Sequence, residues 1–454
     1  MDTRKRAFFA SSLLALLGCL LPMGLTLGEV ESSNTNHVHN VNSGLDYTSI
    51  QDAIDAAETL NGHTILVAPG TYFEHVTVSK SLALFGQERS NTVIDGGGDV
   101  VIHVTANDVL VGALTLKHGF LGIYLDHSNN SVLFENTLVD MTDYYAVYAS
   151  YSNNCTIRHN SIASNLCSGI LVTNSFDFRI SNNYVHNNTG YGINANASMN
   201  GLIMQNEAFE NFYDGIGLGE GCQNCIITGN NVSNNGLFGI WLDSDSVDNI
   251  IYDNNIINNG RQASVYVTNH WDNGVEGNYW SDYTGVDQDY NGIGDTPIVI
   301  GENNTDNYPL MGMFQAFEAK LVSDVDVVSN SSITDFVFFE SNSTIRMHVA
   351  NRTVTQTSGF CRVRIPHSLM TEPNVKVDGV DPSYWNYTLY DDGDNRWIYF
   401  AYQHSPREVS IQGRVGEFLL YWILAAMVVV AAIPPAILIY LRRLRKRGKT
   451  TTQP

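Results

Sequence analysis

Three aspartates carry the side chains that glycan cleavage requires. Asp243 and Asp245 lie in one expected turn, close to Trp241, and Asp214 lies earlier in the chain. Hydrolysis of a glycosidic bond uses two carboxyl groups roughly 5–10 Å apart. One interpretation is therefore a polysaccharide hydrolase with Asp243, Asp245 and Asp214 as its catalytic residues. The competing interpretation is an aspartate-rich turn that faces solvent.

A polysaccharide lyase would need a base beside a cationic site that holds a carboxylate. The basic residues available in this part of the chain are few and do not share a column: Arg158, Arg179, Arg261 and Lys117. We therefore expect binding rather than catalysis, and we keep a hydrolase or lyase as the alternative function.

Aromatic residues recur at one phase of a repeating pattern, at Tyr124, Tyr148, Trp241 and Tyr266. Each follows an aliphatic residue that is expected to point inward, so each should point outward from its strand. Apolar faces of sugar rings can stack on such rings. The sequence thus predicts a row of glycan contacts, although exposed aromatic residues are also common simply because they suit strands.

An acidic loop has the spacing of a calcium site. Asp287, Asp289, Asn291 and Asp295 occupy the oxygen positions of an EF-hand-like loop, with Gly292 at its sixth position. The twelfth position, which normally supplies a closing carboxylate, is Ile298. Weak binding of a structural calcium ion is one expectation, and a metal-free cap rich in Asx turns is the other. No cofactor is required by either.

Asparagine sequons are frequent, and an asparagine-rich chain produces many by chance. The better glycosylation candidates lie outside the repeats, in a part of the chain expected to be extracellular: Asn330, Asn342, Asn351 and Asn386.

The elements that position these residues come from an internal repeat of about 23 residues. One aliphatic column is Ile123, Val147, Ile170, Ile193, Ile216, Ile240 and Val265. A second is Leu133, Ile157, Ile180, Ile203, Ile227, Ile251 and Val275. Three residues after each member of the second column comes an asparagine: Asn136, Asn160, Asn183, Asn206, Asn230, Asn254 and Asn278.

This repeat predicts an all-β solenoid. The apolar runs are short and alternate as strands do, and turn residues leave no room for helices. One coil cannot close a core alone, but stacked parallel coils bury a shared aliphatic column. Leucine-rich repeats have a similar period but need a helix-forming half. We predict a parallel β-helix with a ladder of stacked asparagines.

The ends of the solenoid should be covered. An amphipathic stretch places Ile50, Ala53, Ile54 and Ala57 on one face, with Thr48 or Ser49 as its N-cap and Asn61-Gly62 after it. We expect this helix to cap the first coil. Beyond the repeats, alternating residues of 314–412 predict a small antiparallel β-sandwich that acts as a spacer.

The termini predict targeting segments. Residues 1–28 have the shape of a signal peptide. Residues 418–441 are long and apolar enough for one transmembrane helix, and the basic residues 442–454 should form a cytoplasmic tail. The predicted domains are therefore a signal peptide at 1–28, a β-helix at 29–313, a sandwich at 314–412, the membrane helix and the tail.

Several segments resemble the NosD-like branch of the pectin-lyase-type right-handed parallel β-helices. They are "YTSIQDAIDAA", "TILVAPGTYFEHVTVSKSLALFG", "VIDGGG", the repeats and "GNYWSDYTG…NGIGDTPIVI…DNYPL". The resemblance implies a right-handed β-helix, often one that binds or cleaves carbohydrate at a cell surface. Membrane-anchored versions resemble archaeal surface proteins.

Copper, which the NosD name suggests, would need histidine and methionine ligands. Six histidines of the β-helix region share no spacing, so we expect isolated surface histidines: His103, His118, His127, His159, His186 and His270.

The net charge of the chain limits the classes of partner that it can bind. The net charge is −22, and nine of the 24 basic residues lie at the two ends. An acidic surface repels phosphate backbones, so nucleic acid is excluded as a partner. The expected protein is anchored in the cell membrane by a single span, with its bulk outside the cell. There it binds polysaccharide or envelope glycan, and the remaining alternative is a surface scaffold without a glycan ligand.

Overall fold

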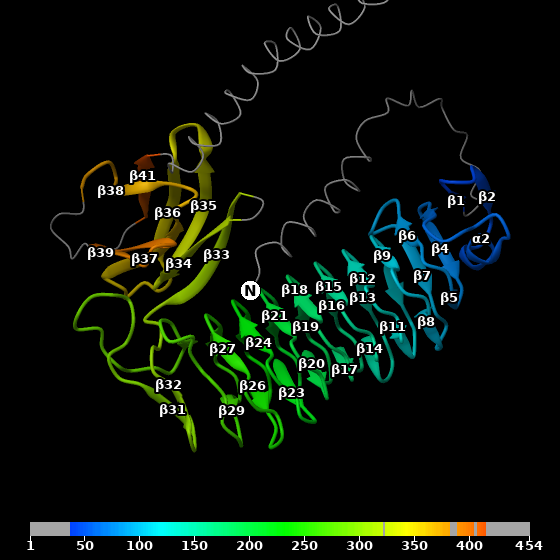
Figure 1. Cartoon of the computed structure of the whole chain (residues 1–454), viewed down its shortest axis with the longest axis horizontal. Helices are drawn as coiled ribbons and strands as arrows, with labels where there is room; N and C mark the ends of the chain where they lie inside the picture. The colour runs from blue at the N-terminus through cyan, green and yellow to red at the C-terminus, as the bar shows by residue number, and fades with distance from the viewer. Residues whose placement is uncertain (1–36, 321–322, 382–387, 404–405, 415–454) are drawn as a thin grey trace, which may run out of the picture. The chain divides into compact units, whose positions relative to one another are not determined.

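The computed structural model describes residues 37–320, 323–381, 388–403 and 406–414. Within them the chain winds through repeated coils, and each coil gives one short strand in turn to three sheets, which we name A, B and C (Figure 1). Successive coils pair in parallel, so the predicted all-β solenoid is confirmed.

Sheet A has 11 strands in the spatial order β2 (Leu45–Tyr47), β1 (Val38–Asn40), β3 (Thr64–Val67), β6 (Ala83–Gly86), β9 (Leu110–Gly112), β12 (Val132–Phe134), β15 (Thr156–Arg158), β18 (Arg179–Ser181), β21 (Leu202–Met204), β24 (Ile226–Thr228) and β27 (Ile250–Tyr252). Sheet B has 10 strands: β4 (Gly70–Phe73), β7 (Thr92–Asp95), β10 (Thr115–Lys117), β13 (Thr137–Val139), β16 (Ser161–Ala163), β19 (Tyr184–His186), β22 (Glu207–Phe209), β25 (Asn231–Ser233), β28 (Asn255–Ile257) and β30 (Tyr279–Trp280). Sheet C has nine strands: β5 (Val76–Val78), β8 (Val100–Val104), β11 (Leu121–Asp126), β14 (Tyr145–Ser150), β17 (Ser168–Thr173), β20 (Ile193–Asn196), β23 (Ile216–Gly219), β26 (Phe238–Leu242) and β29 (Arg261–Ser264).

The first aliphatic column is confirmed from Ile123 to Ile240, whose members pair coil to coil and are fully buried. The prediction of Val265 for the seventh position was wrong. Ile240 pairs with Ala263, not Val265, because the last strand of sheet C keeps the spacing of 263 − 240 = 23 residues, whereas Val265 lies 25 residues after Ile240.

The second column shows a similar error at its end. It is regular from Leu133 to Ile251, but Val275 is 50% exposed. The backbone N–H of Ile251 donates to the carbonyl of His270, and the next residue, Trp271, is fully buried in the core. A large aromatic ring thus takes the place expected for an aliphatic one.

The asparagine ladder is confirmed over its whole length. At each step the side-chain Nδ2 of one asparagine donates to Oδ1 of the next, at 2.9–3.1 Å from Asn136 to Asn278. The ladder ends on the Asp306 carboxylate, which accepts from the Asn278 N–H and from Trp280 Nε1. Burial raises the pKa of Asp306 to about 6, against hydrogen bonds that lower it.

A second ladder runs five residues after the first and was not predicted. It comprises Asn165, Asn188, Asn211, Asn235 and Asn259. Buried backbone groups at tight corners need partners, and these amides supply them at each coil.

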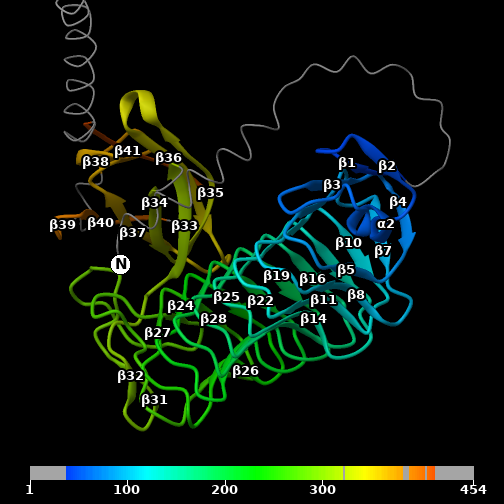
Figure 2. The same ribbon diagram turned by 45° about the vertical axis from the view of Figure 1, so that its right-hand side comes forward.

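The N-terminal end is covered as expected, although by a shorter helix. Helix α2 lies at the N-terminal end of the coils (Figure 2). It spans Ile50–Asp55, with Ser49 as the N-cap accepting from the Asp52 N–H, and it buries Ile50, Ala53 and Ile54. The helix ends before Ala57, which is exposed, and not at Asn61-Gly62. The Glu74 carboxylate accepts the first helical N–H groups, those of Ile50 and Gln51, which strengthens the cap.

After the coils come a hairpin and two antiparallel sheets. The hairpin is β31 (Ile298–Gly301) with β32 (Asn304–Asp306). Sheet F has the order β33 (Met313–Lys320), β34 (Ser323–Ser329), β37 (Ser358–Pro366), β40 (Asn395–Gln403) and β39 (Thr388–Asp391). Sheet G has the order β35 (Ser331–Phe339), β36 (Thr344–Asn351), β41 (Arg407–Arg414) and β38 (Thr371–Val377), and the 3₁₀ helix η1 spans Glu340–Asn342.

Sheets F and G share one apolar core that includes Val327, Val363 and Phe400 from F and Met347 and Ile411 from G. Two packed antiparallel sheets are what the alternating pattern of residues 314–412 predicts. The boundaries given above for the separate domains stay a prediction.

Specific contacts join the last coils to sheet F. The Asn255 side chain makes two hydrogen bonds to the backbone of Phe314, at 2.8 and 2.7 Å. Arg362 Nε lies 2.9 Å from Glu276 Oε1, and Glu276 is 3% exposed. A buried ion pair is costly to break because one charge is left unpaired, so loss of either Arg362 or Glu276 is expected to be destabilising.

The predicted signal peptide (1–28), membrane helix (418–441) and basic tail (442–454) lie outside the described residues. Among the residues that the structure does describe, no helix is both long and apolar enough to span a bilayer. The five cysteines described are buried and free, so Cys222 and Cys225 do not form a local disulfide.

Candidate functional site

The outward row on sheet C brings together most of the predicted contact residues. The register aligns His103, Tyr124, Tyr148, Leu171, Asn194, Gly217, Trp241 and Ser264, one per coil. Tyr266 was predicted for the last position and is not in the row, because Trp241 pairs with Ser264. Tyr266 is 65% exposed elsewhere on that coil.

Tyr124 and Tyr148 do not offer free ring faces. Their rings stack on each other with centroids 5.0 Å apart and planes 12° apart, and His103 stacks on Tyr124 at 4.9 Å and 3°. Each face of Tyr124 is therefore covered by a neighbour. This end of the row presents ring edges and hydroxyl groups, which can hydrogen-bond a ligand but cannot stack on a sugar.

Trp241 lies in a different environment, created by two glycines on the neighbouring coil. A Cβ at Gly217 would meet Trp241 Cε3 at 3.3 Å, and a Cβ at Gly219 would meet Cζ3 at 3.3 Å. The six-membered ring thus reaches over the glycine coil into space that side chains would otherwise fill. Trp241 itself stays partly exposed.

Amide groups approach the same two glycines from other residues. Asn194 Oδ1 would lie 2.6 Å from a Cβ at Gly217, and Asn196 Oδ1 would lie 2.9 Å from a Cβ at Gly219. Asn194 Oδ1 is buried and has no hydrogen-bond partner. An unpaired buried acceptor costs about 1–3 kcal/mol. Next to it, Asn196 Nδ2 donates to the exposed Glu220 carboxylate at 3.2 Å.

Of the three aspartates considered for catalysis, Asp243 and Asp245 share one turn and Asp214 lies elsewhere. The Asp243 carboxylate accepts from the backbone N–H groups of Glu220, Asp245 and Ser246, as in an Asx turn. Burial raises its pKa, but these hydrogen bonds outweigh burial and hold the pKa below its ordinary value. Asp243 is therefore ionised and engaged in its own turn, and Asp245 is exposed beside it.

Asp214 lies at the opposite end of the strand. It is buried, accepts from the Phe238 N–H at 3.0 Å, and burial raises its pKa to about 6. Asp243 follows Phe238 by five residues, roughly 16 Å along an extended strand. That exceeds the separation at which two carboxyl groups cooperate in glycoside hydrolysis.

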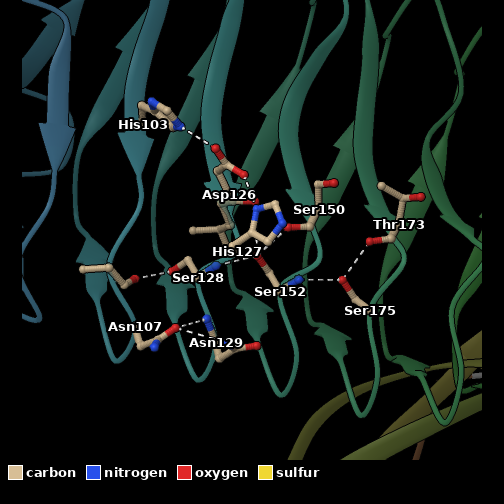
Figure 3. A network of polar contacts seen from close by, with 12 residues as sticks. His103, Asn107, Asp126, His127, Ser128, Asn129, Ser150, Ser152, Thr173 and Ser175 are labelled. Atoms are coloured by element: carbon tan, nitrogen blue, oxygen red, sulfur yellow. Dashed lines mark hydrogen bonds and ion pairs between the residues drawn. The ribbon is translucent and has the colours of Figure 1, made fainter.

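A polar cluster at the other end of sheet C was missed by the sequence analysis. Asp126 Oδ1 lies 2.6 Å from His127 Nδ1, and its Oδ2 lies 3.3 Å from His103 Nε2 (Figure 3). Burial raises the pKa of Asp126, and the hydrogen bonds from both imidazoles outweigh it, so the pKa lies below the ordinary value. Burial, followed by the charge of Asp126, raises the pKa of Tyr124 to about 12.

This cluster can orient imidazole groups for proton transfer. His103 and His127 are not the isolated surface histidines that their irregular spacing predicted, because one carboxylate binds both. The available signal was the register of sheet C, in which His103 aligns with Tyr124 and Asp126 follows on the same face. The shorter first coils conceal that alignment in the sequence.

The acidic loop is closed by its own hydrogen bonds. The two carboxylate oxygens of Asp287 accept from the N–H groups of Asn291 and Gly292, and Asn291 Nδ2 donates to Asp289 Oδ2. Asp295 Oδ2 accepts from the Gln288 N–H. Burial, together with the nearby Asp289, raises the pKa of Asp287. The loop has the expected Asx turns, and calcium binding stays a prediction.

The same loop packs against sheet F. The Asn291 carbonyl accepts from Arg362 Nη1 at 3.0 Å, and Ile293 joins an apolar cluster with Leu310 and Phe360. The loop thus covers the last coil and binds it to the next region, as an end cap would.

A basic pocket lies at the corner between sheets A and B. It has a volume of about 450 Å³ and is lined by Arg89, Glu135, Arg158, His159 and Tyr184, among others. Arg89 donates to Asn136 and Thr137, while Arg158 lies over the Phe134 ring. Two guanidinium groups in one pocket can attract an anionic group, although Glu135 opposes it. The spacing of Arg89 and Arg158 along the chain does not indicate that they line one pocket.

The glycosylation candidates differ in accessibility. Asn342 and Asn351 are exposed. Asn330 is partly buried, and its amide donates to the Ser358 carbonyl and accepts from the Phe360 N–H. Asn386 lies outside the described residues. Glycosylation stays a prediction, and Asn342 and Asn351 are the more accessible acceptors.

Comparisons with known proteins agree with this architecture. Residues 85–285 match the family described as periplasmic copper-binding protein (NosD). A segment of 129 residues is 31% identical to a cell surface glycoprotein of Methanothermus fervidus, covering 28% of this chain and 20% of that protein. The chain thus spans about a fifth of that relative. The predicted resemblance to NosD-like right-handed β-helices is confirmed.

Two solved structures illustrate the similarity. The A-module of mannuronan C-5 epimerase AlgE4 from Azotobacter vinelandii is 20% identical, with a TM-score of 0.37, over 48% of this chain and 76% of that one. Pectate lyase Pel9A is 15% identical, with a TM-score of 0.39, over 50% of this chain and 75% of that one.

Proposed function

We propose that this protein is an extracellular β-helix protein that binds polysaccharide on the outward face of sheet C, around Trp241. The residues expected to contact the glycan are Trp241, Asn194, Asn196 and Glu220, with the hydroxyl groups of Tyr148 and Tyr124 further along the row. The proposal includes a single membrane span at 418–441 with a cytoplasmic tail. The periplasmic description of the NosD family and the cell-surface description of the archaeal relative support an external location.

The observation that carries the proposal is the partly exposed Trp241 ring, which lies over Gly217 and Gly219 of the neighbouring coil. The Asn194 and Asn196 side chains approach the same two glycines, and Asn196 Nδ2 donates to the exposed Glu220 carboxylate. Sugars present apolar C–H faces and hydroxyl groups together, and a site with one aromatic surface and a few placed polar groups matches both. The Asn196 amide and the exposed Glu220 carboxylate lie beside the ring and can hydrogen-bond the hydroxyl groups of a sugar.

The row extends the site along the solenoid. Tyr148 and Trp241 are four coils apart in register, about 19 Å at the usual strand spacing. A polysaccharide chain lying along the row would meet the Tyr148 hydroxyl group at one end and the Trp241 ring at the other. A linear polymer therefore suits the site better than a single sugar.

A glycan array on the ectodomain tests the proposal, with Gly217→Ala as the variant. The added methyl group would lie 2.6 Å from Asn194 Oδ1, so the Asn194 side chain must shift, and 3.3 Å from the Trp241 ring; it changes the surface under the ring without removing a polar group. Ser233→Ala on sheet B is the control. We expect the array signal to fall at least about tenfold in Gly217→Ala only. The absence of any ligand on the array would favour the scaffold without a glycan ligand.

The membrane proposal has its own test. Proteolysis of intact cells should remove residues 30–410 if the bulk of the chain is outside. Protection of that region would place it inside and end the extracellular proposal.

A second candidate function is polysaccharide cleavage, and the cluster of Asp126 with His103 and His127 is the observation that favours it. Beside the Tyr124 hydroxyl group, the cluster places a proton-transfer group on the same face as the proposed binding row. The assay is release of reducing sugar or of unsaturated product from each polysaccharide that the protein binds. Turnover lost in His103→Ala would support this candidate, and binding without turnover would leave the first.

A further inference from the structure

The hairpin that begins the described chain brings two histidines and an aspartate together. Strand β1 pairs antiparallel with both β2 and β3. Val38 and Asn40 are buried, so His39 points to the opposite, outward side. Asp46 on β2 lies directly opposite His39 in the register.

The three side chains converge on one point. Asp46 Oδ1 lies 2.9 Å from His37 Nε2 and 2.6 Å from His39 Nδ1. The imidazole planes are within 8° of parallel. Within the ranges that the structure describes, this is the group of three potential ligands whose donor atoms all lie within 4.8 Å of one another.

Two imidazole nitrogens and one carboxylate oxygen form a recognised ligand set. Hard cations such as calcium prefer oxygen ligands alone, whereas imidazole suits zinc, copper and nickel. Three protein ligands with a fourth, open position is a common arrangement around zinc. The sequence does not indicate the site, because His37 and His39 precede the repeats and Asp46 is brought to them only by the hairpin.

The geometry needs only a small adjustment to admit an ion. Zinc–ligand bonds of about 2.0–2.2 Å in a tetrahedron place ligand atoms roughly 3.3–3.5 Å apart, whereas the distances here are 2.9 and 2.6 Å. The side chains of His37, His39 and Asp46 are 51%, 34% and 52% exposed. They can therefore separate by up to about 1 Å without disturbing the core beneath.

We propose that His37, His39 and Asp46 bind one divalent transition-metal ion of the zinc class. On binding, the ion takes the place of the imidazole protons that now bridge to Asp46. The ion links His37, the first residue that the structure describes, to both strands of the hairpin. Because β1 also pairs with β3, the first strand of the coils, the ion would strengthen the cover of the N-terminal end, which a solenoid needs.

The test is calorimetric titration of metal-free full-length protein with Zn²⁺ and, separately, with Ca²⁺. We expect one Zn²⁺ site per chain and no Ca²⁺ binding at this hairpin. His39→Ala and Asp46→Asn should each weaken Zn²⁺ binding at least about tenfold. His270→Ala, which removes an exposed histidine of the last coils, should leave it unchanged.

A second readout reports the location. Zn²⁺ should slow hydrogen exchange of the amides of residues 38–47 in the wild type and in His270→Ala, but not in Asp46→Asn. Absence of Zn²⁺ uptake by the wild type, equal affinity in His39→Ala, or protection elsewhere but not at the hairpin would each overturn the proposal.

Discussion

Removing one amide from the middle of the asparagine ladder tests what holds the coils together. Asn206 is fully buried. Its Oδ1 accepts from both the backbone N–H and the Nδ2 of Asn183, at 2.9 and 3.0 Å. Its Nδ2 donates to the Ile180 and Met204 carbonyls and to Asn230 Oδ1. Asn206→Ala removes all five hydrogen bonds at once.

The expected cost follows from which groups lose their partners. The Asn183 N–H is buried and left without an acceptor, at about 1–3 kcal/mol. Most of the other groups that bond Asn206 keep a second partner, so the loss of these hydrogen bonds adds about 1 kcal/mol. We therefore expect Asn206→Ala to lower the free energy of unfolding by about 2–4 kcal/mol.

The assay is urea unfolding followed by hydrogen exchange. A solenoid can unfold in parts, so exchange at the Asn183 amide locates the damage that the urea midpoint measures globally. Glu207→Ala, at the adjacent exposed position, is the control and should stay within about 0.5 kcal/mol of wild type. If Asn206→Ala also stays within that range, the ladder does not stabilise the coils as argued.

Three other predictions concern Asp306, the acidic loop and the glycosylation candidates. The raised folded-state pKa of Asp306 means that its stabilising contribution is fully present below the unfolded pKa near 4 and is lost as pH rises through about 6. The free energy of unfolding of the wild type, measured with urea, should therefore rise on acidification across that window, by on the order of 1–3 kcal/mol more than that of Asp306→Asn. Parallel pH profiles of the two proteins would contradict this. Calorimetric titration of the wild type with calcium should show weak heat of binding, and Asp289→Ala should abolish it. Calcium should also stabilise the last coils without changing glycan affinity. If the heat of binding is absent, or equal in both proteins, the acidic loop is not a calcium site. Native protein should lose mass on glycan release, with Asn342 and Asn351 modified before Asn330; an unmodified mass refutes glycosylation.

The repeating part of the fold was predictable because one physical constraint recurs at every coil. Inward aliphatic residues and corner asparagines must align from coil to coil, and their spacing is visible in the sequence. The second ladder had the same signal, since Asn165 and Asn188 lie five residues after members of the first. The errors came in the last coil. Val265 and Tyr266 were placed by a 25-residue step although the register keeps 23 residues, and Val275 was expected although the next step is only 270 − 250 = 20 residues.

The site was less predictable because it depends on neighbours in space. The sequence identified Trp241 as an outward aromatic residue, but its setting depends on Gly217 and Gly219, whose lack of side chains carries no obvious functional signal. Tyr124 and Tyr148 were correctly placed in one row, yet their mutual stacking follows from coil spacing and covers the faces that sugar stacking would need.

The most direct test of polysaccharide binding on sheet C compares two aromatic truncations. The best polysaccharide from the array is titrated into the wild type, Trp241→Ala and Tyr184→Ala, the last removing an exposed ring of sheet B. Loss of a buried aromatic contact of about 1.5–3 kcal/mol predicts affinity at least about tenfold weaker for Trp241→Ala, and unchanged affinity for Tyr184→Ala. Equal affinity of Trp241→Ala and the wild type would contradict the proposal that this face of the β-helix binds the glycan.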